Sequence, residues 1–371
     1  MSAYCGLIIY VLHHWYNTPT TFEYSIPEAH PKNQAHITVI IPARNEANNI
    51  KQCIESILAN SEIENYKPEI IVVDDHSTDA TATIVSDINH PYVQLLSLQD
   101  HIQPSEKINA YKKAAINLGI QKASNQLILQ LDADVIVPQE FLSTINLFIS
   151  RHPIEFVAGP VKMSECRTLL HHFQQLDILG MMAVTAAGIH SKKWYMANGA
   201  NMLYNKRHVT YDAQAIASGD DIYTIQLVAE EYSDSVFFMK NKNAIVTTDA
   251  MHSYASLYYQ RIRWATKNKS MPNLWMQLMM LIPFLNAVIL ISHFAMIYFF
   301  GKAAIMIFLF HLMTKMAADY ILLSEMTDYY GERRSMRYFV PCNLMHVLYI
   351  SAVGVMSLFV KKYTWKSRKV Y

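Results

Sequence analysis

The chain has 371 residues, of which 52% are apolar and 16% are charged, and its formal net charge is +1. This near-neutral balance gives no field that would select nucleic acid. Average soluble chains carry ~25% charged residues, so the low charged fraction predicts that part of the chain lies in lipid. The four cysteines, Cys5, Cys53, Cys166 and Cys342, show neither metal-site spacing nor a disulfide framework, which favours a reducing compartment.

Residues 1–35 are predicted to form an apolar N-terminal anchor followed by a polar linker. The first 16 residues are apolar but lack the basic start and cleavage site of a signal peptide. They are also shorter than the ~20 residues that span a bilayer as a helix. We expect either an interfacial anchor or part of a transmembrane helix.

Residues 36–267 alternate between short apolar runs and helical spacing, which predicts one catalytic domain. Runs typical of buried strands lie at 37–41, 70–73, 93–98 and 127–131, with helical patterns between them. This alternation indicates an open α/β fold with a parallel sheet. Ligands of such sheets bind beyond the carboxyl ends of the strands.

Residues 268–371 are predicted to be a membrane region. The apolar stretches 274–300, 303–323 and 338–360 can each cross ~30 Å of hydrocarbon. The basic tail that follows is expected to be cytoplasmic, because cytosolic segments hold the excess Lys and Arg. Three crossings from a cytoplasmic domain would put this tail on the far side, so the prediction stays at two or three transmembrane helices. Lys315 and Asp319, four residues apart in the second stretch, are interpreted as a mutual ion pair.

Carboxylates stand where two predicted strands end. Asp74 and Asp75 follow the second strand, and Asp132 and Asp134 follow the fourth. The i, i+2 spacing of Asp132 and Asp134 points both side chains to one side of an extended chain. Two such carboxylates can share Mg²⁺ or Mn²⁺, which prefers oxygen ligands and also takes substrate phosphates. A loop or helix cap would account for the Asp-Ala-Asp segment alone, but its place after an apolar strand and the second strand-end pair favour a functional site.

Two further motifs each have a structural and a functional interpretation. Asp220 and Asp221 precede a helical pattern, where they could cap a helix N-terminus or supply a general base for an acceptor hydroxyl. Gln260, Arg261, Arg263 and Trp264 could form a basic, aromatic interfacial helix. They could also bind a diphosphate through Arg and stack on a sugar through Trp.

Taken in order, these motifs resemble the membrane branch of the family 2 glycosyltransferases, which includes cellulose, hyaluronan and poly-N-acetylglucosamine synthases and ceramide glucosyltransferases. The resemblance implies a GT-A nucleotide-diphospho-sugar transferase fold, with a Rossmann-like mixed sheet, followed by C-terminal transmembrane helices. The segments that carry it are Ile-Pro-Ala-Arg-Asn-Glu at 41–46, Val-Asp-Asp-His-Ser-Thr-Asp at 73–79, Lys-Lys-Ala-Ala-Ile-Asn at 112–117, Asp-Ala-Asp at 132–134, Asn-Gly-Ala-Asn at 198–201, Gly-Asp-Asp at 219–221 and Gln-Arg-Ile-Arg-Trp at 260–264. Tyr111 departs from the family, which has glycine there.

The resemblance also implies residue roles. Asp221 is expected to be the general base with Asp220 as its neighbour, and Asp132 and Asp134 are expected to hold Mg²⁺ or Mn²⁺. Acceptor contacts are expected from Gly199, Gln260 and Trp264. Donor contacts are expected from Pro42, Ala43, Glu46, Asp74, Asp75, Lys112, Asp132, Arg261 and Arg263.

The function so predicted is an inverting transfer of a sugar from a nucleotide-sugar, by family expectation a UDP-sugar, to a polysaccharide or lipid-linked acceptor. The expected partners are that donor, a lipid or glycan acceptor, membrane lipids and an export subunit, with no nucleic acid. The expected location is a bacterial inner membrane, with several crossings and a cytoplasmic catalytic domain. Three alternatives stay open: a single-transfer lipid glycosyltransferase, a nucleotide-binding membrane subunit without catalysis, and a metal-dependent nucleotidyl or phosphoryl transferase.

Overall fold

The structure is a computed structural model of the chain that describes residues 1–20, 36–101, 110–209, 220–266, 273–359, 363–365 and 368–370. Its internal contacts divide the chain into two compact units. The sheet unit comprises residues 19–162, 195–249 and 364–371. The helical unit comprises residues 1–18, 163–194 and 250–363. Part of the predicted catalytic range, 163–194 and 250–267, therefore groups with the apolar C-terminal helices.

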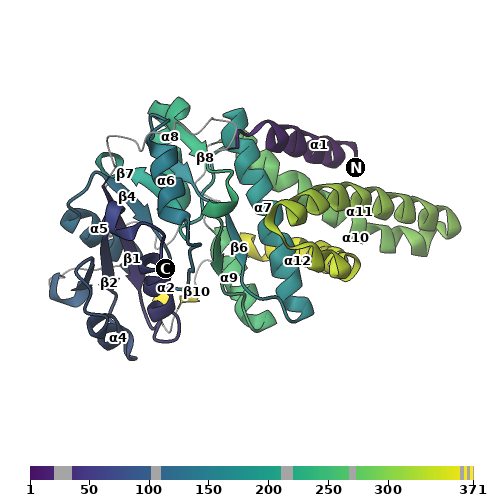
Figure 1. Ribbon diagram of the computed structural model, residues 1–371. Coiled ribbons are helices and arrows are strands. Elements are labelled where there is room, and N and C mark those ends of the chain that lie inside the picture. The colour runs from purple at the N-terminus through teal and green to yellow at the C-terminus, as the bar shows by residue number, and fades with distance from the viewer. Residues whose placement is uncertain are drawn as a thin grey trace. The chain divides into compact units, whose positions relative to one another are not determined.

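The sheet unit is built on a seven-stranded sheet of order β3-β2-β1-β4-β7-β5-β8 (Figure 1). The first four strands in the chain pair in parallel, and β7 runs antiparallel to both β4 and β5. The sheet is therefore mixed, and its four leading strands confirm the predicted ones. The strands are β1 (Ile37–Ala43), β2 (Glu69–Asp74), β3 (Val93–Ser97), β4 (Leu127–Gln130), β5 (Phe156–Ala158), β7 (Met202–Asn205) and β8 (Val236–Phe238).

Buried branched side chains explain why the central strands form. The run from Ile37 to Ile41 in β1 and the run from Ile70 to Val73 in β2 are almost completely buried, as expected for parallel strands covered on both faces. Gly119 lets α5 approach the sheet, because a Cβ there would lie 2.8 Å from Cγ2 of Ile40. The helices of this unit are α2 (Ile50–Leu58), α3 (Ile63–Tyr66), α4 (Thr81–Asp87), α5 (Tyr111–Lys122), α6 (Phe141–Ile149) and α8 (Asp220–Tyr232).

A two-stranded sheet of β6 (Val161–Met163) and β9 (Val246–Thr248) stands apart from the large one. An isolated bridge joins Ile136 to Thr247, so β9 also runs beside the segment that follows β4. This pairing brings Thr248 to the end of the sheet where the Asp-Ala-Asp segment lies.

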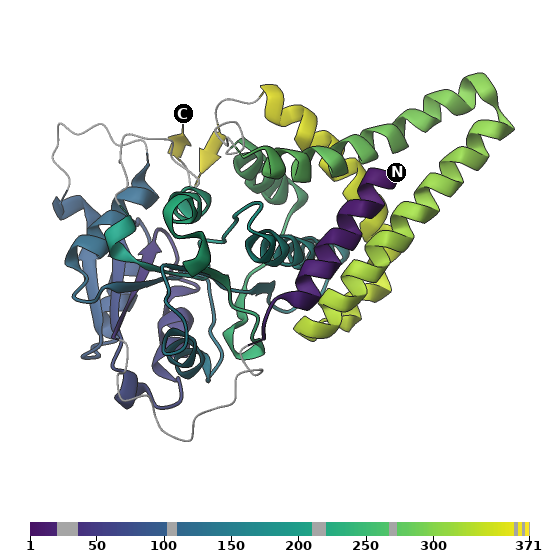
Figure 2. The same ribbon diagram turned by 90° about the horizontal axis from the view of Figure 1, so that it is seen from above.

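The helical unit gathers helices from three separate stretches of the chain. These are α1 (Ser2–Asn17), α7 (Leu169–Ser191), α9 (Tyr254–Thr266), α10 (Leu274–Phe300), α11 (Lys302–Tyr330) and α12 (Phe339–Phe359), with the 3-10 helix η7 (Arg333–Tyr338) before α12. The helices α10 and α11 form a long hairpin that turns at Gly301, where φ is +57° (Figure 2). Glycine suits this turn because L residues rarely adopt positive φ.

Three helical spans of this unit are long and apolar enough to cross a membrane: Leu274–Phe300, Lys302–Tyr330 and Arg333–Met356. Each of these spans, found among the described residues, overlaps one of the three predicted stretches, and the first has the predicted bounds. The predicted anchor forms α1, which buries Tyr4, Ile8, Val11 and Trp15 and packs against α7 and α11. Most of the predicted linker, residues 21–35, lies outside the described residues.

Polar side chains meet inside these apolar helices. Lys315 Nζ donates hydrogen bonds to Asp319 Oδ2 at 2.6 Å and to Asn343 Oδ1 at 2.9 Å. Asn343 Nδ2 donates to Asp319 Oδ2 at 2.7 Å, and the hydroxyl of Tyr4 donates to Asp319 Oδ1. The predicted Lys315–Asp319 ion pair is confirmed. Because its charges are paired and hydrogen-bonded, this cluster joins α1, α11 and α12 without leaving a buried charge uncompensated.

Candidate active site

The site begins where the parallel strands β2, β1 and β4 end side by side. Ala43, the last residue of β1, is in register with Asp74, the last residue of β2, and the amide of Leu131 after β4 donates to Ile40 O at 3.1 Å. The chain leaves β1 toward β2 and β3 on one side, while β4 adds on the other side. This is the point where strand order reverses, and open α/β sheets bind ligands there. The predicted donor residues Pro42, Ala43 and Asp74 therefore share one edge of the sheet.

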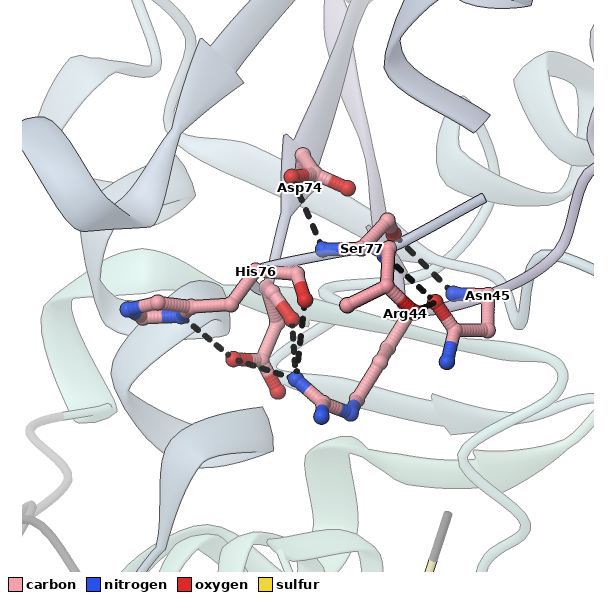
Figure 3. A network of polar contacts seen from close by, with 7 residues as sticks. Arg44, Asn45, Asp74, His76 and Ser77 are labelled. Carbon is pink, nitrogen blue, oxygen red and sulfur yellow. Dashed lines mark hydrogen bonds and ion pairs between the residues drawn. The ribbon is translucent and has the colours of Figure 1, made fainter. Parts of the chain in front are cut away.

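The loops after β1 and β2 are joined by a polar network (Figure 3). Arg44 Nη1 donates to the carbonyls of Asp75 at 2.7 Å and His76 at 3.1 Å, and Asn45 N donates to Ser77 Oγ at 3.0 Å. Asn45 and His76 have φ of +50° and +52°. Positive φ is uncommon outside glycine but enriched in Asn and His. The two loops therefore form one cross-linked rim at the edge of the sheet.

The acidic pair after β2 is part of this rim. The Asp75 side chain is 3% exposed and accepts a contact from His76 Nδ1 at 3.0 Å, with Arg44 Nη1 at 3.9 Å. Asp74 Oδ2 accepts from Ser77 N at 3.2 Å, whereas Asp74 Oδ1 is buried and has no hydrogen-bond partner among the described residues. The nucleoside contact expected from Asp75 stays a prediction, and Asp74 Oδ1 is a second acceptor at the same edge.

Asp134, in the acidic pair after β4, has a strongly raised pKa. Burial, together with the charges of Asp132 and Glu46, raises the pKa of Asp134 to about 6, against a hydrogen bond that Thr248 Oγ1 donates to Asp134 Oδ2 at 3.1 Å. Asp132 Oδ1 accepts from Lys112 Nζ at 2.7 Å. The structure thus brings together four residues that the sequence assigned to the donor or metal: Glu46, Lys112, Asp132 and Asp134.

These residues fit a divalent cation that shares its coordination with a substrate. Within the described residues no three His, Cys, Asp or Glu side chains form a complete metal cage. Mg²⁺ sites at phosphates need only one or two carboxylates, with waters and phosphate oxygens completing the shell. The raised pKa of Asp134 reflects burial first and then the nearby negative charges of Asp132 and Glu46, and a bound cation would offset these effects on the carboxylate. Asp132 and Asp134 therefore suit the predicted Mg²⁺ or Mn²⁺.

The predicted acceptor glycine lies in a tightly held loop. Gly199 is buried, and the amide of Ala200 donates to Asn198 Oδ1 at 3.1 Å. Asn201 Nδ2 donates to the carbonyls of Pro160 at 3.1 Å and Ala244 at 3.0 Å. These bonds hold the loop between neighbouring chain segments, so its backbone is a rigid feature of the sheet unit.

The predicted base stands at the start of α8, which begins at Asp220. Asp221 is half-buried, and its Oδ1 accepts from the amide of Ile222 at 2.9 Å. Gly219, the first residue of the motif, lies outside the described residues.

The Gln-Arg-Ile-Arg-Trp motif lies on α9 in the helical unit. The Arg261 side chain is 1% exposed, and its Nη2 is 2.8 Å from Asp177 Oδ2 of α7. Its guanidinium carbon lies 4.1 Å from the ring centroid of Trp264. Arg263 and Trp264 are half-buried, and Gln260 Oε1 is buried with no hydrogen-bond partner among the described residues. The expected donor contacts of Arg261 and Arg263 and acceptor contacts of Gln260 and Trp264 stay predictions.

Sequence reasoning missed the residues that support this site. Arg44 was named only as part of its motif, and the structure shows that it is buried directly after β1. Thr248 reaches Asp134 through β9, and Asp177 reaches Arg261 through α7, from positions 114 and 84 residues away along the chain. No local pattern marks either contact.

The fold is similar to that of a solved mannosyltransferase. The chain aligns over 97% of its length with 98% of a solved mannosyltransferase, PcManGT from Pyrobaculum calidifontis in complex with GDP-Man and Mn²⁺, at a TM-score of 0.51 and 17% identity. The mixed sheet followed by apolar helices is accordingly a GT-A fold. Residues 38–220 match the family described as Glycosyl transferase family 2. The matched residues, just under half of the chain, form a family 2 glycosyltransferase domain.

Curated relatives cover parts of the chain. A dolichyl-phosphate beta-glucosyltransferase, ALG5D of Trichomonas vaginalis, is 27% identical over 197 residues, which cover 48% of this chain and 58% of the relative. The poly-beta-1,6-N-acetyl-D-glucosamine synthase of Staphylococcus aureus is 33% identical over 106 residues, covering 28% of this chain and 23% of the relative. This chain therefore spans less than two thirds of the length of either relative.

Proposed function

We propose that the protein is an inverting, metal-dependent glycosyltransferase that moves a sugar from a nucleotide-sugar to a lipid-linked or glycan acceptor at a membrane. The observation that carries this proposal is the cluster of carboxylates beyond β2, β1 and β4, at the point of the sheet where strand order reverses. The match of residues 38–220 to family 2 and the GT-A fold support the same function.

Donor binding is assigned to the sheet unit. The rim formed by the loops after β1 and β2 would hold the nucleoside through Asp74 and Asp75. Asp132 and Asp134 would hold Mg²⁺ or Mn²⁺ against the diphosphate, and the ion would neutralise charge on the leaving group. Lys112, which contacts Asp132, is placed to contribute a second positive charge to the same phosphates. A UDP-sugar is the proposed donor.

Transfer requires one displacement at the anomeric carbon. The acceptor oxygen forms a bond to that carbon while the bond from the carbon to the diphosphate oxygen breaks. The hydroxyl proton passes to the Asp221 carboxylate, with Asp220 adjacent, and the nucleoside diphosphate leaves with the electron pair. A single displacement inverts the anomeric configuration. The proposed stabilisation of the leaving group by Arg263 is electrostatic.

The acceptor is proposed to be presented at a membrane. The three apolar helices would cross or enter the lipid, with a cytoplasmic catalytic unit in a bacterial plasma membrane. Gly199, Gln260 and Trp264 would contribute acceptor contacts, Trp264 by stacking on a sugar. Within the described residues three helices are long and apolar enough to cross a membrane, which is few for a wide polysaccharide channel, and one relative is named for a dolichyl-phosphate acceptor. Both points favour a single transfer to a lipid over polymer synthesis, which an export subunit would otherwise assist.

Release of nucleoside diphosphate tests this function. Protein purified in detergent would be given Mn²⁺ or Mg²⁺, a panel of UDP- and GDP-sugars, and dolichyl phosphate or a bacterial lipid extract as acceptor. We expect release with one donor, and a loss of roughly 10²–10⁴-fold in rate with Asp221→Asn, because a general base contributes that much. Donor affinity should be unchanged in this variant.

Each other result has a distinct meaning. Equal rates in wild type and Asp221→Asn would remove Asp221 as the base. Release of pyrophosphate in place of nucleoside diphosphate would indicate a nucleotidyl transferase. Tight metal-dependent nucleotide binding with no release from any donor would favour a binding subunit without catalysis.

A further inference from the structure

Three helices of the helical unit pack through an apolar cluster. Leu170, Phe173 and Leu176 of α7 contact Leu257 of α9 and Cys342 of α12 within it. These side chains are at most 5% exposed. The cluster fixes which faces of the three helices point toward one another, because residues four apart lie on the same face of a helix.

About one turn further along each of the three helices, an ionisable side chain follows the apolar ones. Asp177 follows Phe173 by four residues, Arg261 follows Leu257 by four, and His346 follows Cys342 by four. Arg261 Nη2 and Asp177 Oδ2 are 2.8 Å apart. His346 interacts electrostatically with both of them. The charged layer therefore continues the apolar seam and is positioned by it.

Arg261 also contacts the residue to which acceptor binding was assigned. Its guanidinium carbon is 4.1 Å from the ring centroid of Trp264, three residues further along α9. A guanidinium stacks on an indole face through both its charge and its planar shape. The Arg261 side chain is 1% exposed and that of Asp177 is 10% exposed, so this ion pair is shielded from water.

We propose that Asp177 is a positioning residue for Trp264, acting through Arg261. The inference rests on the proposed function, in which Trp264 binds the acceptor. Asp177 fixes the plane and direction of the Arg261 guanidinium, and the guanidinium fixes the ring of Trp264. Arg261 itself then serves to hold the motif in place, in contrast to the donor contact expected from the sequence. The contact with Asp177 is an ion pair by distance, and none of the three guanidinium nitrogens has a hydrogen-bond partner among the described residues, so a phosphate contact remains the competing outcome.

Removing one charge separates these outcomes. In Asp177→Asn the guanidinium is left buried without its counter-charge and must reorient. We expect the KM for dolichyl phosphate to rise roughly tenfold or more, because small misplacements of binding groups are costly. The KM for the nucleotide-sugar and the Mn²⁺-dependent affinity for UDP should not change. Arg261→Gln should give the same defect, and the two changes together should be no worse than either one.

The matched control is the exposed pair of Arg167 and Glu165, whose side chains are both 76% exposed. Arg167→Gln removes a guanidinium from a carboxylate without disturbing a buried group, so all kinetic constants should stay at the wild-type value. Exposed ion pairs contribute little.

Two results would overturn the proposal. One is a wild-type acceptor KM in a folded Asp177→Asn protein. The other is a raised donor KM in Arg261→Gln but not in Asp177→Asn, which would make Arg261 a donor ligand. If Asp177→Asn does not fold, Asp177→Leu with Arg261→Met removes both charges and keeps the volume. This double variant loses the contact with Trp264, so a wild-type acceptor KM in it would equally contradict the proposal.

A spectroscopic measurement separates this inference from the proposed function. Asp177→Asn should shift the tryptophan emission of the wild-type protein and leave that of Trp264→Phe unshifted. This difference needs no turnover. An emission shift in a protein that transfers no sugar would contradict the proposed function alone, whereas equal shifts in both backgrounds would contradict the positioning role.

Discussion

The sheet unit and the helical unit differ in how the charges of two buried clusters are compensated. In the sheet unit, Asp132, Asp134 and Glu46 lie close enough together for burial and mutual repulsion to raise the pKa of Asp134 to about 6. In the helical unit, Lys315 and Asp319 form a buried ion pair at 2.6 Å, with Asn343 and Tyr4 as further partners.

This difference separates a ligand site from a structural contact. Closely spaced carboxylates repel one another, which costs free energy unless a bound cation compensates their charge. Their presence together at the end of the strands therefore indicates a functional site. A paired and hydrogen-bonded charge in an apolar helix bundle is already compensated and needs no ligand. The same residue types thus have different roles because their charge balance differs.

The largest effect on stability is expected where the balanced charges are separated. Asp319→Asn should lower the free energy of unfolding by ~3–5 kcal/mol, because Lys315 is left buried without a counter-charge. Replacing both residues, Lys315→Met with Asp319→Leu, should cost much less. Thermal unfolding in detergent would measure both variants. Equal losses in the single and double variants would show that the pair is not the unit of stability.

A smaller effect is expected where the sheet unit is held by neutral hydrogen bonds. A Cβ on Gly159 would lie 2.2 Å from the Asn201 side chain, which is bonded to two carbonyls and cannot move away cheaply. Gly159→Ala should therefore lower the free energy of unfolding by ~1–3 kcal/mol. Gly6→Ala is the control, since a Cβ there meets no atom within 4 Å. Similar unfolding temperatures for the two variants would contradict the tight packing of this loop.

The smallest effect is expected from a substitution beside the carboxylates of Asp132 and Asp134 that leaves their charge unchanged. Thr248→Val removes the hydrogen bond to Asp134 Oδ2. We expect metal affinity to fall roughly tenfold, because groups that orient a metal ligand contribute about that much. That hydrogen bond stabilises the carboxylate and lowers its pKa. Metal binding needs the carboxylate, so affinity should fall as pH drops through about 6, and Thr248→Val should move this midpoint to higher pH. Titrations with Mn²⁺ at several pH values would reveal it, with Thr314→Val as the control.

Local patterns were enough to predict the leading half of the fold. The four apolar runs became β1 to β4, since buried parallel strands are continuous in sequence. The strands β5 to β9 have three or four residues each, too few to show a period. The sequence also did not predict that α1, α7 and α9 group with the C-terminal helices, because this grouping depends on contacts between segments far apart in the chain.

The site shows the same division. Asp74, Asp132 and Asp134 were predictable because acidic residues directly after an apolar strand have a definite place in an open sheet. Arg261 was assigned from its motif, but its burial depends on Asp177, whose position in a long, mostly buried helix has no distinctive pattern. Sequence therefore located the chemistry, and packing decided which charges were compensated.

The central claim is that the carboxylates beyond β4 bind a nucleotide diphosphate through a metal. The most direct test is calorimetric binding of UDP and GDP to wild type and to Asp134→Ala, with and without Mn²⁺. The claim predicts that Mn²⁺ strengthens nucleotide binding in wild type and that this gain disappears in Asp134→Ala. A Mn²⁺-dependent affinity in Asp134→Ala equal to that of wild type would contradict it.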